Sequence, residues 1–251
     1  MEKNEQMLDL LLATGSIEID LRTRQGDTAL CLALLIEPSF ESGAEKLLSR
    51  GATPNPRYPG DEADSLLHKL ARDSREDAAL FLLEPLEGEG DNVTTKKKYR
   101  TDSESLEARN REGWTVLHEA ARSGLSNLCQ RLLERLPTLL NGRTLVGDTA
   151  IHLAVGHGKL QALRALLDAA PDDDVRKELL TSKNKDAETP LSLALGAVIK
   201  DKDVLRALIN AGADLEQRNE SGHTALHQAI LKEDSASAIF LLENGADMNA
   251  K

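Results

Sequence analysis

Four of the six histidines share one local setting, since each lies three residues after a threonine or serine at the start of an apolar stretch. Imidazole is the commonest metal-binding side chain in proteins, so a metal site is one interpretation of this recurrence. A metal ion needs its ligands to converge on one point, whereas one histidine per repeated segment spreads them along the molecule. We therefore predict that each ring bonds to neighbouring backbone, and that none holds a metal. The four are His68, His118, His152 and His227.

The sequence contains no other recognisable catalytic pattern. It has no glycine-rich phosphate loop, no nucleophile elbow and no cysteine pair at zinc-binding spacing. Cys31 and Cys129 each lie inside an apolar helical pattern, which predicts buried thiols in a reducing compartment. We expect neither enzymatic activity nor a cofactor.

The composition and charge restrict the kinds of molecule that the chain is expected to bind. The 251 residues are 40% hydrophobic and only 2% aromatic, and the formal net charge is −11. Such a charge argues against nucleic acid or an anionic membrane as a direct partner. No apolar run approaches the roughly 18 residues of a membrane span, and the first residues lack a signal-peptide core. We expect a cytoplasmic helical protein that binds no nucleic acid and does not insert into a membrane.

The stretch that organises the chain is residues 216–249. Two apolar runs at helical spacing lie inside it, TALHQAI and ASAIFLL, separated by a polar corner. The stretch resembles an ankyrin repeat, in which a turn glycine precedes T-P-L-H-x-A, a corner and L-L-L-x-x-G-A-D-V-N. The resemblance implies an all-α solenoid of stacked helix-turn-helix pairs with short hairpin tips. The matching residues are Gly222, Thr224, Leu226, His227, Ala229, Leu241, Leu242, Gly245, Ala246, Asp247 and Asn249.

Further copies cover nearly all of the chain as a single array over residues 1–251. We assign repeats to residues 22–55, 58–84, 107–141, 142–181, 182–216 and 217–250, with a partial repeat over 7–21. The polar residues 85–106 predict an inserted, solvated loop, and residues 171–180 predict an extra helical turn with acidic residues at its start. The last copy keeps apolar residues where a terminal repeat is usually polar, so we expect the array to continue beyond both ends in a longer parent chain.

Members of this family bind partners on a concave face, and the resemblance therefore implies candidate binding residues. Trp114 is expected beside Leu145 and Val146, because an aromatic next to two exposed aliphatics is what a binding hot spot requires. Acidic neighbours would favour a partner that combines an apolar anchor with basic residues. The alternative is that Trp114 packs over its own hairpin. The expected face comprises Arg111, Glu112, Trp114, Arg122, Leu145, Val146, Asp148, His157, Asp186, Glu188 and His223.

Two groups of basic residues allow both a functional and a structural interpretation. The first group consists of one basic residue at the same turn position of successive repeats. These residues could face an acidic partner, but we favour the interpretation that they are solvated turn residues. The other is the KKKYR run at residues 96–100, which we expect to be part of the solvated loop rather than a lipid-binding or protein-binding patch. Phosphorylation of Thr94, Thr95, Thr101, Ser103 or Ser105 is a further use of that loop. The recurring turn residues are Arg22, Arg109, Arg143, Lys183 and Arg218.

The function expected from the sequence is protein–protein recognition by a non-catalytic scaffold or adaptor fragment of a larger ankyrin-repeat protein. The irregular repeats and long insertions are similar in style to large endosomal trafficking scaffolds of this family. That similarity implies, as one alternative, recruitment of a small GTPase or sorting factor at endosomal membranes through other domains. A second alternative is a regulatory domain that masks an attached enzyme or transcription factor. Neither alternative rests on a particular residue.

Overall fold

The structure is a computed structural model that describes residues 10, 18–36, 40–58, 64–85, 100–196 and 201–250. In these ranges it consists of helices and turns, and an isolated antiparallel bridge joins Arg57 to Ser65. The expected all-α architecture is thereby confirmed. The chain divides into unit 1, Met1–Arg111, and unit 2, Glu112–Lys251, and each unit is described by itself. Ten of the fifteen residues of the expected partial repeat over 7–21 lie outside the described residues.

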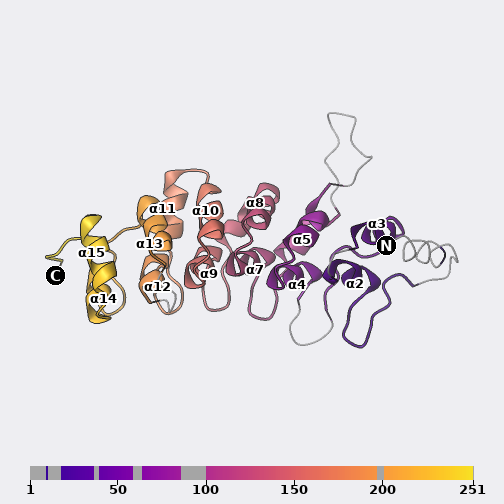
Figure 1. Ribbon diagram of the computed structural model, residues 1–251, viewed down its shortest axis with the longest axis horizontal. Helices are drawn as coiled ribbons and strands as arrows, with labels where there is room; N and C mark the ends of the chain where they lie inside the picture. The colour runs from indigo at the N-terminus through magenta and orange to yellow at the C-terminus, as the bar shows by residue number, and fades with distance from the viewer. Residues whose placement is uncertain are drawn as a thin grey trace. The chain divides into compact units, whose positions relative to one another are not determined.

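The described residues of unit 1 form two helical hairpins and one short additional helix, and Figure 1 labels the four hairpin helices. The first hairpin pairs α2 (Ala29–Leu35) with α3 (Glu41–Ser49), and the second pairs α4 (Leu66–Arg72) with α5 (Glu76–Leu83). The additional helix is α6 (Ser103–Glu107). Leucine and alanine fill the core, as expected from helices that approach closely without aromatic spacers.

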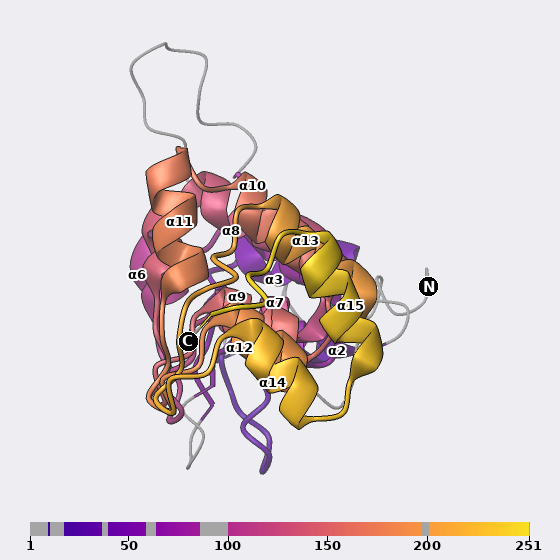
Figure 2. The ribbon, with the colours of Figure 1, turned by 90° about the vertical axis from the view of Figure 1, so that its left-hand side faces the viewer.

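Unit 2 contains four helical hairpins whose first helices contact one another in sequence order. In Figure 2 these first helices lie below the second helices, with the hairpin tips gathered at the lower left and α11 at the upper left. The hairpins are α7 (Val116–Ser123) with α8 (Ser126–Arg135), α9 (Ala150–Gly156) with α10 (Leu160–Asp168), α12 (Pro190–Gly196) with α13 (Lys202–Asn210), and α14 (Ala225–Leu231) with α15 (Ser235–Glu243).

The helix boundaries follow from the residues at their ends. Thr149 precedes α9, and its hydroxyl accepts from the backbone N–H of His152, which satisfies one of the unpaired first-turn donors. The glycines Gly51, Gly212 and Gly245 end second helices at φ of +93°, a left-handed conformation that other residues adopt only under strain. The threonine and glycine positions of the repeat pattern thus begin first helices and end second helices at these positions.

Two elements of unit 2 fill positions where the repeat pattern is interrupted. The 3₁₀ helix η1 (Pro137–Asn141) replaces the usual G-A-D-V-N segment, and its proline lies in the first turn, where no N–H is needed. The helix α11 (Asp173–Thr181) is longer than the single turn expected over 171–180. Asp172 caps it by accepting from Val175 N at 2.8 Å, and two further aspartates in the first turn favour the positive end of the helix dipole.

The expected solvated loop over 85–106 is wrong for its last part. Residues 86–99 lie outside the described residues. Arg100 and the segment after it pack against the end of α5, within unit 1. The Arg100 guanidinium lies over the Phe81 ring at 3.9 Å, donates to Phe81 O at 2.7 Å, and pairs with Glu84 and Glu45 at 3.0 and 3.2 Å. Its side chain is only 9% exposed, so the last residue of the KKKYR run is a packing residue.

The residues that follow Arg100 are also held. Thr101 is 2% exposed and its hydroxyl donates to Leu82 O at 3.0 Å, so this candidate phosphorylation site is buried in the folded unit. Asp102 caps α6 by accepting from Ser105 N at 2.7 Å, and Leu106 is fully buried. A stretch with one apolar residue looks like a loop, yet here one buried leucine and two side-chain bonds are enough to order it.

Candidate functional site

The candidate site is the surface that the hairpin tips and the first helices of unit 2 form together, which we call the inner face. The tips comprise residues 112–114, 143–148, 183–188 and 218–223, and the first helices are α7, α9, α12 and α14. A hollow lined jointly by the last two tips and by residues of α12 and α14 shows that these elements face the same space.

The second, third and fourth tips are each closed by hydrogen bonds of their own. In the third tip, Asn184 N donates to Glu188 O at 3.0 Å, and the Asn184 amide oxygen accepts from the backbone N–H groups of Asp186 and Glu188. Asparagine is suited to this because its side chain mimics a backbone turn. The last residue of the turn needs positive φ, which glycine supplies at Gly147 (+84°) and alanine adopts at Ala187 (+53°).

The first three tips are also bonded to one another. Leu145 N donates to Glu112 O, and Lys185 N donates to Val146 O, each at 2.9 Å. A Cβ added to Gly147 would lie 3.0 Å from Lys185 N, so this glycine is required both for its φ and for the close approach. The side chains of these tips are therefore presented from a hydrogen-bonded backbone rather than from independent loops.

The recurring histidines bond to backbone and to the capping hydroxyls, as predicted. His152 Nδ1 lies 2.9 Å from Thr149 Oγ1 and accepts from Thr149 N, while its Nε2 lies 3.1 Å from Glu188 O on the following tip. His118 repeats the arrangement, with Nε2 at 3.2 Å from Gly142 O. Burial lowers the pKa of His152, which keeps the ring neutral and able to make both bonds. His118 and His152 therefore each link the first helix of their own repeat to the segment that leads into the next repeat.

The first half of the inner face carries aromatic and aliphatic side chains. Leu145 and Val146 are 60% and 54% exposed, and Leu145 lies against Gly113, the residue before Trp114. Trp114 is half-buried, with the Arg122 guanidinium 5.5 Å from its ring centre. The same guanidinium lies 3.8 Å from the buried Glu119 carboxylate. The tryptophan therefore packs on its own hairpin and still presents part of its ring.

His157 lies close to this aromatic patch. Its side chain is exposed at the end of α9, and its pKa is lowered, first by partial desolvation and then by the positive charges of Arg122 and Lys159. His157 is therefore neutral at pH 7, and Arg122 and Lys159 place positive charge beside it.

The second half of the inner face is an acidic hollow of about 320 Å³. Asp186, Glu188 and Glu220 contribute carboxylates, and Lys232 contributes one ammonium group from the end of α14. Three residues predicted from the sequence meet here, namely Asp186, Glu188 and His223. The prediction missed Ser192 and Gln228 on the adjoining helices, because in these two repeats it considered only tip positions. Their place three and four residues after the capping threonine could have identified them.

Of the other predicted residues, Asp148 and Glu112 lie on tips of the inner face, whereas Arg111 belongs to unit 1. Asp148 is half-buried and accepts from the Asn184 side chain at 2.9 Å. Glu112 is exposed on the first tip, and Arg111 is exposed as the last residue of unit 1. The structure thus brings Trp114 together with Arg122 and places Leu145 beside the preceding tip, while the acidic residues gather two repeats further on.

The recurring basic turn residues link successive repeats. Arg143 donates to Gly147 O at 3.2 Å, which closes its own turn, and to Lys183 O at 2.9 Å in the next repeat. Lys183 in turn donates to Arg218 O at 3.1 Å. These bonds explain the recurrence by a structural role rather than by a basic surface for an acidic partner. The residues were expected to be merely solvated, whereas they bond to the following repeat.

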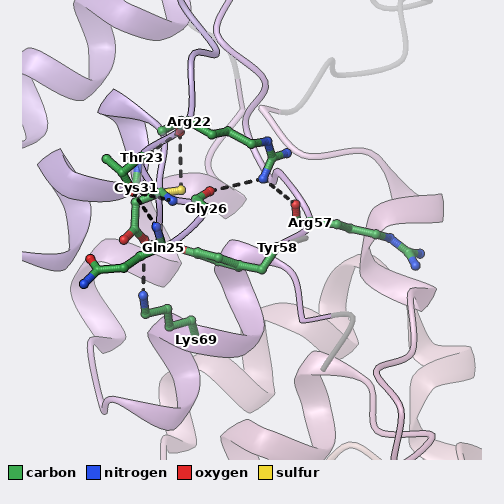
Figure 3. Close-up of polar contacts among 10 residues, drawn as sticks. Arg22, Thr23, Gln25, Gly26, Cys31, Arg57, Tyr58 and Lys69 are labelled. Carbon is green, nitrogen blue, oxygen red and sulfur yellow. Dashed lines mark hydrogen bonds and ion pairs between the residues drawn. The ribbon is translucent and has the colours of Figure 1, made fainter. Parts of the chain in front are cut away.

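Unit 1 uses the equivalent tip position differently. Figure 3 shows Arg22, Tyr58 and Lys69 among the polar contacts of this region. Asp27 is 5% exposed and accepts from the Tyr58 hydroxyl at 2.9 Å and from Lys69 Nζ at 3.2 Å. Burial, together with neighbouring Cys31 and Asp27, raises the pKa of Tyr58. Arg22 donates to Gly26 O and to Arg57 O in the following repeat, as Arg143 does in unit 2. Tyr58 follows the basic residue Arg57, at the position where the tips of unit 2 have Asn or Thr. This position in the repeat could have identified Tyr58 as a tip residue.

Neither a metal site nor a membrane span emerges from the part of the chain that the structure describes. Over those residues, no three His, Cys, Asp or Glu side chains are grouped as a metal ion would require. Both cysteines are free and buried, in agreement with the sequence. None of the described helices is both long and apolar enough to cross a bilayer.

Comparison with known proteins gives the family. The ankyrin-repeat model, which represents three copies, matches residues 67–177 and 172–251. Since these ranges cover well over half of the sequence and coincide with helical hairpins, the chain belongs to the ankyrin-repeat family.

Individual relatives are similar to this chain over part of their length. Human rabankyrin-5 is 29% identical over 197 residues, which are 77% of this chain and 15% of that protein. The E3 ubiquitin-protein ligase KEG of Arabidopsis thaliana is 29% identical over 140 residues, 56% of this chain and 8% of the ligase. Mouse neurogenic locus notch homolog protein 1 is 35% identical over 138 residues, 55% of this chain and 5% of that protein. The chain thus spans no more than 15% of these relatives.

Proposed function

We propose that the inner face of unit 2 binds a protein partner. An apolar anchor of the partner would contact the first half of the face, and basic residues of the partner would contact the acidic second half. Ankyrin repeats are a non-catalytic protein–protein interaction module, and this chain belongs to that family. The proposal extends that role to particular residues and includes the absence of any catalytic activity or cofactor of the chain's own.

The observation that carries the proposal is the exposure of Leu145 and Val146 on a tip that is bonded on both sides. Two neighbouring aliphatic side chains, each more than half exposed, contribute to binding by leaving water when a partner covers them. Their backbone is already fixed by bonds to Glu112 and Lys185, so little entropy is lost on ordering them. Trp114 and Arg122 extend the same surface along α7.

The acidic hollow determines the charge that such a partner should carry. Asp186 and Glu220 are exposed, Glu188 is half-buried, and Lys232 supplies a single positive charge among the residues that line the hollow. A lysine or arginine of the partner would find several carboxylates within one small space. Complementary charge of this kind mainly raises the association rate and selects against acidic partners.

The test compares binding partners of the wild-type chain with those of Leu145→Asp/Val146→Asp, using proximity labelling in cells followed by titration of the purified partner. We expect the double variant to bind at least tenfold more weakly, and Trp114→Ala about thirtyfold more weakly if it is the central anchor, which corresponds to about 2 kcal/mol. Gln161→Asp on the exposed surface of α10 is the matched control, because it introduces the same side chain away from the inner face.

Unchanged binding by a folded double variant would exclude the inner face. Thermal melts of all three variants separate loss of binding from loss of folding. A partner whose binding is insensitive to Leu145→Asp/Val146→Asp but lost in Gln161→Asp would place the site on the second helices.

We also propose that a further helical hairpin packs on α14 and α15 in a longer chain. Ile230 is 61% exposed, whereas the residues at the same register in the three preceding repeats, Ala121, Val155 and Leu195, are at most 3% exposed. Leu242 is 38% exposed, while its equivalents Leu133 and Leu167 are 5% exposed and Ile209 is half-buried. Fusing one consensus ankyrin repeat after residue 250 should raise the melting temperature by several degrees. The same fusion should give no gain in Ile230→Asp/Leu242→Asp.

Two narrower roles draw their support from the relatives. The match to rabankyrin-5 over 77% of the chain favours an endosomal trafficking scaffold, cytoplasmic and attached to membranes through other domains of the parent protein. The match to KEG, an E3 ubiquitin-protein ligase by name, favours a regulatory domain attached to an enzyme. Colocalisation of the tagged full-length protein with endosomes would support the first role. A diffuse distribution, together with a linked enzyme whose activity rises when the repeats are deleted, would support the second.

A further inference from the structure

Unit 2 has a second candidate binding site, a groove of about 700 Å³ that none of the residues predicted from the sequence lines. It lies between α8 and η1 on one side and α10 and the start of α11 on the other. In Figure 2, α11 is on the opposite side of the unit from α14, which contributes to the inner face. The groove is therefore separate from the surface described above.

The groove has an apolar floor and partly apolar walls. Leu133, Leu140 and Ala165 are each 4–5% exposed and form its depth. Pro137 is exposed on one wall, and Val175 is half-buried on the other. A space of this size, mostly apolar with a few polar groups, falls within the range of sites that bind small ligands or the side chains of a short segment.

The walls of the groove come from the two elements that depart from the repeat pattern. The C-terminal half of α11 is anchored by Leu179 and Leu180, which are 4% and 2% exposed. Its N-terminal half carries Val175, which faces the groove without being fully covered. Because the wall is a capped helix anchored in the core, the groove is preformed, and binding would require little ordering of the chain.

The charges at the groove favour a basic occupant. Glu134 and Asp168 are exposed lining residues, and within the continuous described stretch 100–196 no lysine or arginine lines the groove. Arg131 and Glu134, which both lie on α8, form an ion pair at 3.0 Å. Exposed ion pairs of this kind contribute little free energy, so a cation of a partner can replace Arg131.

We propose that this groove binds a short segment of a partner protein that inserts one or two large apolar side chains and carries lysine or arginine beside them. The apolar floor accounts for the first requirement, and the carboxylates of Glu134 and Asp168 account for the second. The inner face and this groove would then allow the chain to hold two partners at once, as a scaffold does.

The test is a selection of randomised seven-residue peptides displayed on phage, performed on the whole chain with counter-selection on Val175→Lys. That variant replaces an apolar wall residue by a cation at a half-exposed position, so it should remain folded, as a thermal melt will show. We expect the enriched peptides to combine Leu, Ile, Phe or Met with Lys or Arg. Synthetic versions should bind Val175→Lys at least tenfold more weakly than wild type, and should bind Val175→Met nearly as well as wild type.

Controls on the inner face distinguish this proposal from the previous one. Leu145→Asp/Val146→Asp should leave affinity for the selected peptides unchanged. The proposal is overturned if no peptide is enriched, if the enriched peptides are acidic, or if they bind wild type and Val175→Lys equally. It is also overturned if methyl resonances of Val175 and Leu133 shift with protein concentration in the absence of peptide, because the groove would then bind a second copy of the chain.

Discussion

The two units use the same register position, the residue before the capping threonine or serine, in opposite ways. In unit 1 this residue is Asp27 or Asp64, and both are 5% exposed or less. Asp27 is bonded to Lys69, and Asp64 is bonded to Arg72 at 2.7 Å. In unit 2 the equivalent carboxylates are Asp148 and Glu188, which stay half-buried on the inner face, with Glu188 lining the acidic hollow; the remaining positions are Trp114 and His223.

The difference originates in the helix beside each tip. Lys69 is four residues after its capping serine and reaches the carboxylate of the preceding repeat. In unit 2 that position holds no cation, since its residues are Glu119, Leu153, Leu193 and Gln228. Arg72 is seven residues after the same serine. Its equivalent Arg122 lies over Trp114 and pairs with Glu119 of its own helix at 3.8 Å rather than with a tip carboxylate. A tip carboxylate therefore stabilises the fold where a neighbouring helix supplies a cation, and faces solvent where it does not.

Breaking the buried pair in unit 1 should have the largest effect. Asp64→Ala removes the acceptor for Arg72 and for the Asn110 amide at 3.1 Å. Arg72 is 33% exposed and can recover some hydration, so the expected loss is about 2–3 kcal/mol rather than the larger cost of a fully buried charge. In urea denaturation, the matched variant Glu188→Ala should change stability by less than about 0.5 kcal/mol. Equal losses in the two variants would contradict the contrast between the units.

The next effect concerns the tips that present the inner face. Gly147→Ala should cost about 2 kcal/mol, because alanine at φ +84° is strained and its Cβ would lie 3.0 Å from Lys185 N. Ala187→Gly is the reverse change at the equivalent turn position and should stabilise by about 0.5 kcal/mol, since relief of left-handed strain exceeds the added chain entropy. Opposite signs for these two variants, measured by thermal and urea unfolding, would support the description of the tips.

A single cation should convert part of unit 2 to the arrangement of unit 1. Gln228 lines the acidic hollow at the position equivalent to Lys69. Gln228→Lys should pair with Glu188 and stabilise by roughly 0.5 kcal/mol, the value expected for a partly exposed ion pair. It should also weaken binding of a basic partner at the inner face. Gln228→Met, of similar length and without charge, should do neither. A destabilised Gln228→Lys variant would show that the two positions are not equivalent.

The smallest effect is a dependence of stability on pH. The pKa of His152 is lowered in the folded state, first by desolvation, so below its unfolded pKa of about 6.5 the unfolded chain binds more protons than the folded one. The stability due to the neutral ring is therefore fully present above about pH 6.5 and is lost as pH falls toward and through the lowered folded pKa. His152→Gln should reduce the slope of unfolding free energy between pH 7 and pH 5. Identical slopes would indicate that His152 titrates normally.

The repeat pattern predicted much of the fold because its signals are local. The capping threonines, the histidines and the glycines at positive φ act within a few residues of their own positions, so each could be identified from the sequence. The segment from Arg100 to Glu107 could not be, since its order depends on contacts with Phe81 and Leu82 that are distant in sequence. For the same reason α11 proved longer than expected, because Leu179 and Leu180 become buried only in the folded unit.

By itself, the sequence determined the family, the all-α architecture, the bonding of the histidines and the tip positions that carry Trp114, Leu145, Val146 and the acidic residues. Only the tertiary structure decided which carboxylates are neutralised, which basic turn residues link successive repeats, and where the groove lined by Val175 lies. The physical reason is that capping and turn formation involve neighbouring residues, whereas burial, ion pairing and cavity shape depend on side chains that folding brings together from different repeats.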